Sequence, residues 1–245
     1  MRDGHNVILD KGLILRNPLE VYNALVSNEK ILRWHLFISK YYLPPKDKLL
    51  LLFYPCSAVK PYNASRTYRT LFKTLAKLGS KRKLIHVITI SEPFALVPEE
   101  YYNRKTEWHD WENDWYECPG LFEWWCKRNK QPYEKHYADM CIEILSNVIA
   151  EFLKRLKEEL RNKKLVGFVR TYSSTFRVTH SNTHRHMLEK ASKKSNVPII
   201  LLPTKKFIVN LIEKRGRVAW DFYGVSHPMA QEYLLKKIRG FLQEW

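Results

Sequence analysis

The sequence has 245 residues and a mass of 29.4 kDa, which suits one folded domain with at most a small addition. Lys and Arg number 42 against 25 Asp and Glu, so the formal net charge is +17, and 45% of the residues are hydrophobic. That hydrophobic fraction excludes a disordered basic tail, and the charge makes an ordinary near-neutral metabolic enzyme a poor default. A folded domain with this charge favours a polyanionic partner, above all a nucleic acid, over a merely solvated cationic surface.

Other classes are excluded by what the sequence lacks. It has no apolar run of 18 residues, so we expect no membrane partner, and its N-terminus shows no secretory pattern. The four cysteines, at positions 56, 118, 126 and 141, include no C-x2-C pair, which predicts free thiols in a cytoplasmic protein. Without a zinc-ribbon spacing or a phosphate-binding glycine loop, we expect no metal and no cofactor. The scarcity of glutamine is weakly typical of thermophiles.

The charge is unevenly distributed along the chain. Residues 1–98 carry a net charge of +10, residues 99–150 of −5 and residues 151–245 of +12. The acidic middle part includes the segment 101–133, which holds five of the eight tryptophans. We interpret this segment as an insert that packs as a lid beside a pocket, with a base-stacking platform as the alternative.

The N-terminal segment, residues 1–45, is predicted to be partly helical and to precede one domain over 46–245. A helix starts at Asn17-Pro18 and a second spans 28–40. Strands follow at 49–53, which is a continuous apolar run, and at 84–90, 165–169, 199–202 and 218–223. Helices are expected at 66–78, 134–160, 183–195, 204–214 and from Ser226, as its cap, to about 242.

Strands that alternate with helices predict an α/β domain of three layers, with a mostly parallel sheet between helices. In such sheets the functional site lies beyond the carboxyl ends of the strands. The loops 54–65, 91–98, 170–180, 203–206 and 223–228 are therefore the candidates for the site.

The first of these loops carries an unusual set of side chains. It reads P-C-S-A-V-K-P-Y-N-A-S-R-T-Y from Pro55 to Tyr68, and it resembles the signature P-C-x3-K-P-Y-x2-S-x2-H of the archaeosine synthase catalytic domain. Six signature positions match: Pro55, Cys56, Lys60, Pro61, Tyr62 and Ser65. Tyr68 stands in place of the final histidine. After the next strand, Ile90–Glu100 resembles the family's I-S-S-P-L-G-x-V-P-x-E-L, with Glu92 in place of a serine.

This resemblance, over about residues 45–245, implies a fold like that of uracil-DNA glycosylases and chemistry on a tRNA nucleoside. The family attaches lysine to the nitrile of 7-cyano-7-deazaguanine in tRNA, so the resemblance implies tRNA as the partner, lysine as co-substrate, and a transglycosylase or radical enzyme as a protein partner. Cys56 is the candidate nucleophile toward the nitrile carbon, activated by Lys60 and a helix N-terminus; the alternative is a small packing residue at the strand end. Lys60 itself would contact a phosphate or a carboxylate, or be a solvated lysine of the loop.

The other candidates have roles in binding. Tyr62 would stack on a flipped base or pack as a half-buried ring, and Ser65 would touch substrate or cap the helix at 66–78. Glu92 would bind a guanine-like edge or an amine. His227 follows Gly224-Val225-Ser226 and would contact a phosphate, act as an acid or base, or simply start a helix. Phosphate contacts are expected from Arg66, Arg69, Arg170, Arg177, Arg185, Lys205 and Lys206.

Two features leave alternatives open. His180, His184 and His186 do not share one helical face, so we interpret them as polar residues at a helix start rather than a metal site. Because tyrosine does not replace a histidine proton shuttle, a non-catalytic nucleic-acid-binding module is the main alternative to a tRNA-modifying enzyme. A glycosylase-like enzyme acting on DNA is the second alternative, weakened because the loop from Pro55 to Tyr62 contains no aspartate.

Overall fold

The computed structural model describes residues 9–169, 183–204, 206, 207, 210, 213 and 224–243. The helices are α1 (Pro18–Ser27), α2 (Glu29–Leu36), α3 (Arg66–Ala76), α4 (Glu123–Arg128), α5 (Lys135–Arg155), α6 (Lys157–Leu160), α7 (Thr183–Ser195) and α10 (Pro228–Phe241). The strands are β1 (Leu9–Ile14), β2 (Leu50–Pro55), β3 (Ile85–Ser91), β4 (Ala95–Pro98), β5 (Trp115–Glu117), β6 (Lys164–Phe168) and β7 (Ile200–Leu202).

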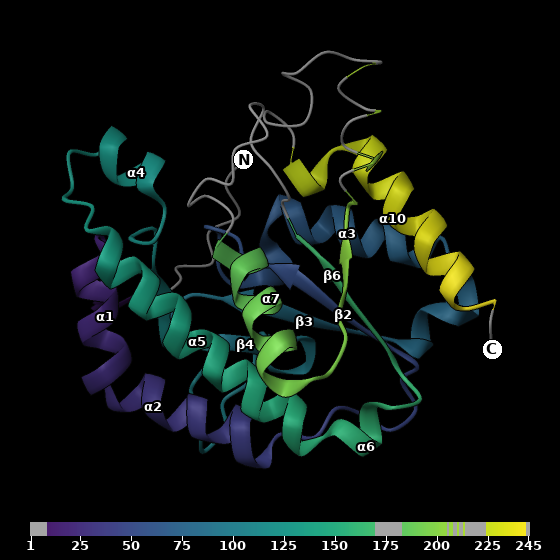
Figure 1. Cartoon of the computed structure of the whole chain (residues 1–245), viewed down its shortest axis with the longest axis horizontal. Coiled ribbons are helices and arrows are strands. Elements are labelled where there is room, and N and C mark those ends of the chain that lie inside the picture. The colour runs from purple at the N-terminus through teal and green to yellow at the C-terminus, as the bar shows by residue number, and fades with distance from the viewer. Residues whose placement is uncertain are drawn as a thin grey trace.

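The central sheet has the strand order β4-β3-β2-β6-β7, in which β4 alone is antiparallel to its neighbour. From β2 the chain moves to β3 through α3, and it then returns past β2 to β6 through α5. Such crossover connections are right-handed. The connection through α3 moves along the sheet in one direction and those through α5 and α7 move in the other, so α3 lies on one face of the sheet and α5 with α7 on the other. Figure 1 shows these layers, with α5 and α7 in front of the sheet and α3 behind it, where α10 packs against α3.

Burial explains why the strands could be found from their apolar runs. Every residue of β3 is buried, and β2 is buried from Leu50 to Tyr54, because helices cover both faces. The α/β class with a sheet flanked by helices is confirmed, as are four of the five predicted strands. The fifth, 218–223, lies outside the described residues, and so does most of the helix predicted at 204–214.

Two predictions about this part of the fold are wrong. Residues 95–98 form β4 rather than a loop, because the chain reverses at Pro93-Phe94, with Ala95 in the left-handed region at φ 58°, and pairs back onto β3. The last helix is capped by His227 instead of Ser226: the His227 Nδ1 atom accepts a hydrogen bond from the Met229 amide at 3.2 Å.

The insert is tied to the N-terminal segment by a small second sheet. Strand β1 pairs in parallel with β5, a pairing that the helical prediction for residues 1–45 misses. Trp111 and Trp115 of the insert are fully buried in the same hydrophobic core as Trp34 of α2. The division of the chain at residue 45 remains a prediction. Among the described residues, no helix combines the length and apolar character needed to cross a membrane.

Candidate active site

The ends of two neighbouring strands bring Cys56 and Glu92 together. Cys56 directly follows β2, and its amide donates a hydrogen bond to the Ile90 carbonyl of β3 at 2.9 Å, which extends the pairing of the two strands. Glu92 directly follows β3. Since parallel strands present their carboxyl ends at one edge, the two side chains meet there. The Cys56 thiol donates to Glu92 Oε2 at 3.6 Å.

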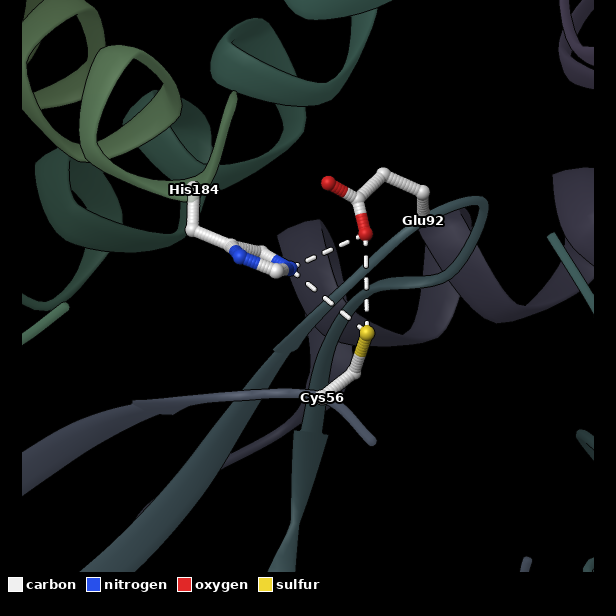
Figure 2. A group of neighbouring side chains, drawn as sticks. All are labelled: Cys56, Glu92 and His184. Carbon is white, nitrogen blue, oxygen red and sulfur yellow. Dashed lines mark hydrogen bonds and ion pairs between the residues drawn. The ribbon is translucent and has the colours of Figure 1, made fainter. Parts of the chain in front are cut away.

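The third member of the cluster comes from helix α7, which packs against α5. His184 lies in the first turn of α7, and its Nε2 atom is 3.0 Å from Glu92 Oε2 and 3.6 Å from Cys56 Sγ. Figure 2 shows the three side chains converging from the end of β2, the turn after β3 and the start of α7. A thiol, an imidazole and a carboxylate therefore meet around one point.

The electrostatics of the cluster favour a charged imidazole. Burial disfavours the imidazolium, but the neighbouring Glu92 and Cys56 outweigh this effect and raise the pKa of His184 to about 10. Glu92 is 0% exposed, and its second oxygen, Oε1, has no hydrogen-bond partner among the described residues. A buried carboxylate oxygen without a partner is costly, which marks it as a place for a ligand group.

The cluster opens into a cavity of about 250 Å³. Its floor comes from two of the predicted strand-end loops, with Cys56 and Lys60 in the first and Glu92 in the second. Its wall comes from the insert: Tyr116, Glu117, Cys118, Pro119, Phe122, Trp124 and Trp125. Trp124 is 53% exposed at the rim. Part of the insert thus belongs to the core, and part lines this cavity.

Lys60 lies in this floor rather than in solvent. Its side chain is buried, its Nζ donates to the Ser57 carbonyl, and it sits over the ring of Tyr116 at 4.5 Å from the centroid. Burial lowers the pKa of Lys60. Cys118 lines the same cavity, where burial raises the pKa of its thiol well above the ordinary value. Of the two cavity thiols, Cys56 is the one in contact with a charged imidazole.

Three other sequence candidates have structural contacts instead of a place in the cavity. Tyr62 is fully buried, with its hydroxyl hydrogen-bonded to that of Tyr116, so it has no free ring face for a base. Ser65 caps α3 by accepting from the Tyr68 amide at 3.1 Å. His227 caps α10, as described above.

Position 68, where the signature has a histidine, is also in the core. The Tyr68 ring is fully buried, and its hydroxyl lies 2.5 Å from Thr89 Oγ1 and donates to the Pro55 carbonyl at 3.2 Å. Tyr68 therefore lies in the core and holds the carbonyl of Pro55, the residue directly before Cys56. Burial raises its pKa well above the ordinary value, so it is a neutral hydrogen-bonding group.

The predicted phosphate contacts differ in their exposure, and Arg185 is only partly exposed. Arg66 and Arg69 are exposed on α3, Lys206 is exposed, and Arg185 forms an ion pair with Glu189 at 2.8 Å. The remaining candidates, Arg170, Arg177 and Lys205, lie outside the described residues.

Sequence reasoning missed His184 as a site residue. Its only signal is its position at the start of a helix that follows a strand-end loop, and the spacing of His180, His184 and His186 points away from a shared site. Of the aromatic wall of the cavity, Trp124 and Trp125 belong to the insert that the sequence placed beside a pocket, whereas Phe122 was missed. The tryptophan-rich composition of the insert was the signal for that wall.

Comparison with known proteins bears on the same strand-end loops. Residues 31–107 match a family described as a domain of unknown function, DUF5591. This span is just under a third of the chain; it includes Cys56 and Glu92 and ends before His184.

Curated relatives share a segment of similar length. Archaeosine synthase subunit alpha of Thermococcus kodakarensis is 37% identical over 83 residues, which are 33% of this chain and 14% of that protein. The Methanosarcina acetivorans protein of the same name is 36% identical over 75 residues, 31% of this chain and 11% of its own length. This chain contains a segment related to archaeosine synthase subunit alpha. The matched segment spans only a small part of these relatives' own length.

A solved structure is similar at low identity. The crystal structure of AF0587, a protein of unknown function, matches 84% of this chain and 49% of that one, with 16% identity and a TM-score of 0.45.

Proposed function

We propose that this protein acts on a 7-deazaguanine nucleoside of tRNA in the formation of archaeosine. The observation that carries the proposal is the contact between the Cys56 thiol, the His184 imidazolium and the Glu92 carboxylate beside an aromatic-walled cavity. The names of the curated relatives support the substrate class, and the net charge of +17 suits a tRNA partner. A fold of the uracil-DNA glycosylase kind, with a base pocket at the strand ends, is part of the same proposal.

The chemistry we propose is the addition of an amine to the nitrile of 7-cyano-7-deazaguanine. The Cys56 sulfur attacks the nitrile carbon and one bond of the C≡N group breaks. The thiol proton passes to the His184–Glu92 pair, and the pair gives a proton to the nitrile nitrogen, so a neutral thioimidate results. The amine of lysine then attacks the same carbon, the carbon–sulfur bond breaks, and the amine proton returns to the sulfur to leave an amidine.

The wall of the cavity would hold the base. Trp124, Trp125 and Phe122 offer aromatic faces, and stacking on such faces is worth about 1–3 kcal/mol per base. They take over the stacking role that sequence reasoning gives to Tyr62. The unpartnered Glu92 Oε1 would accept a hydrogen bond from the base edge or from the incoming amine.

The tRNA backbone would lie near α3. This helix exposes Arg66, Arg69 and Lys73, is followed by the exposed Lys77, and contains no acidic residue. It starts immediately after the loop that holds Cys56 and Lys60, so phosphate contacts on it would present a nucleoside to the cavity. A transglycosylase or a radical enzyme as protein partner is a further part of the proposal.

The test uses a tRNA transcript that carries 7-cyano-7-deazaguanine, with lysine and the purified chain. Digestion to nucleosides and mass spectrometry should show a product heavier by one lysine, and Cys56→Ser should abolish it. Cys126→Ser is the matched control, because Cys126 is a buried thiol of the insert that contacts the Gly120 carbonyl and lies outside the cavity lining. Equal turnover by Cys56→Ser would refute the nucleophilic role, and tRNA binding with no product would favour a non-catalytic binding module.

A further inference from the structure

We propose that Cys56, Glu92 and His184 form a binding site for a zinc ion, with the fourth coordination position facing the cavity. The sulfur, nitrogen and oxygen atoms of these three residues all lie within 4.8 Å of one another. The site goes beyond the proposed tRNA chemistry and does not depend on it, because metal binding is measured on the protein alone.

The separations of the three atoms fit a tetrahedral zinc site. Zinc binds sulfur at about 2.3 Å, imidazole nitrogen at about 2.0–2.1 Å and carboxylate oxygen at about 2.0–2.2 Å. At tetrahedral angles these lengths place sulfur about 3.5–3.6 Å from each of the other atoms, and nitrogen about 3.4 Å from oxygen. The observed distances are 3.6 Å for both sulfur contacts and 3.0 Å between His184 Nε2 and Glu92 Oε2. Movements of a few tenths of an ångström would seat the ion.

The kind of ligand favours zinc over the hard divalent ions Mg²⁺ and Ca²⁺. A thiolate and an imidazole are poor ligands for Mg²⁺ and Ca²⁺, which prefer oxygen, whereas zinc accepts sulfur, nitrogen and oxygen together. Three protein ligands with one open position are typical of reactive zinc sites rather than closed structural ones. Cys56 and Glu92 line the cavity, so the open position is directed into it.

The unpartnered oxygen of Glu92 provides an independent argument. Glu92 is fully buried, and only Oε2 has contacts with His184 and Cys56. With Oε2 on the metal, Oε1 would accept a hydrogen bond from a water molecule or an amine at the fourth position. Zinc would thus satisfy both oxygens of a carboxylate that the described part of the protein alone leaves half satisfied.

Zinc and the nitrile would compete for one sulfur atom. A Cys56 thiolate bound to zinc has its lone pair on the metal and is withheld from the nitrile carbon, so the loaded site would be protected from modification. The same competition would apply to any alkylating reagent. Zinc binding and covalent chemistry are therefore alternative states of this cluster.

The first experiment measures metal affinity. The full chain is stripped with a chelator and titrated with Zn²⁺ against a chromophoric competitor; one ion per chain is expected. Cys56→Ser, Glu92→Gln and His184→Ala should each weaken binding by at least about tenfold, since the loss of residues that only support a metal ligand already costs about 10–100-fold. Cys118→Ser is the matched control, since Cys118 lines the same cavity outside the cluster. The zinc affinity of this variant should equal that of the wild type. Circular dichroism of each metal-free variant shows whether it is folded.

The second experiment identifies the ligands without relying on affinity. Co²⁺ in the same site should give sulfur-to-metal charge-transfer absorption in the wild type, and this absorption should vanish in Cys56→Ser. In the wild type, Zn²⁺ should slow the alkylation of Cys56 by iodoacetamide and leave Cys118 unaffected, as read by peptide mass spectrometry. Zinc binding that survives all three substitutions, or no binding of zinc or cobalt by a folded wild type, would overturn the proposal. The tRNA reaction can fail without changing any of these readouts.

Discussion

His35 connects the N-terminal helices to the turn that carries Glu92, and it should make the fold sensitive to acid. The ring lies on α2, is only 6% exposed, and has its Nε2 atom 2.8 Å from the Pro93 carbonyl oxygen. Because a carbonyl only accepts hydrogen bonds, the proton of the neutral ring is on Nε2. Burial without a carboxylate partner lowers the pKa of His35 from 6.5 to about 4.

The sign of the effect follows from which state binds the proton. Below pH 6.5 the unfolded chain protonates His35 while the folded chain does not. The contribution of this residue to stability is therefore complete above pH 6.5, falls as the pH drops toward 4 and levels off below that value. The difference between the two pKa values corresponds to a loss of about 3 kcal/mol of unfolding free energy.

The assay is urea unfolding of the wild type and of His35→Gln between pH 7 and pH 4. Glutamine can still donate a hydrogen bond toward the Pro93 carbonyl but does not titrate. Between pH 7 and pH 4 the unfolding free energy of the wild type should therefore fall by about 2–3 kcal/mol more than that of His35→Gln. His109 of the insert is a second case, because burial lowers its pKa to about 4 as well. His109→Gln should flatten the profile further when combined with His35→Gln. Parallel pH profiles for the wild type and His35→Gln would refute the reasoning.

Substitutions at three further positions, Tyr68, Ser65 and Gly120, test the packing of the fold by urea unfolding, with Gly240 as a control position. Tyr68→His, which restores the signature residue at a fully buried position, should lower stability by about 1–3 kcal/mol and leave the reaction with nitrile-bearing tRNA no faster; a faster reaction would show that position 68 reaches the substrate. Ser65→Ala should cost about 1 kcal/mol and Ser65→Asp much less, because both serine and aspartate cap helices; equal losses would contradict the capping role. Gly120→Ala would place a Cβ 2.7–2.9 Å from the backbone of Asn17 and should cost about 3 kcal/mol. The control Gly240→Ala meets nothing within 4 Å and should stabilise α10 by about 0.5–1 kcal/mol, so similar effects at the two glycines would count against this steric argument.

The fold was predictable where burial dominates the sequence. A continuous apolar run marks β2 and a mostly apolar one marks β3, because both faces of these strands are covered. The four-residue spacing of apolar side chains marks α5. The short strands were not predictable in this way. Strand β4 depends on a reversal in which Ala95, not a glycine, adopts a positive φ, and β1 depends on pairing with β5 a hundred residues away.

The rule that sites lie beyond the carboxyl ends of parallel strands predicted two of the three residues of the cluster. It placed Cys56 and Glu92 beyond neighbouring parallel strands, and their Sγ and Oε2 atoms lie 3.6 Å apart. It did not extend to His184, which is 128 residues from Cys56 and reaches it through the packing of α7 on α5. Side chains that arrive from a different layer have no local signal in the sequence.

The position of His184 changes how the missing signature histidine should be interpreted. From the sequence, Tyr68 argues for a domain that has lost its proton shuttle. In the structure, position 68 faces the core beneath the Cys56 loop, and an imidazole reaches the thiol from α7 instead. A histidine can therefore be lost from the motif without being lost from the site. Activity that depends on His184 and is indifferent to residue 68 would establish this replacement, and a chain active without His184 would exclude it.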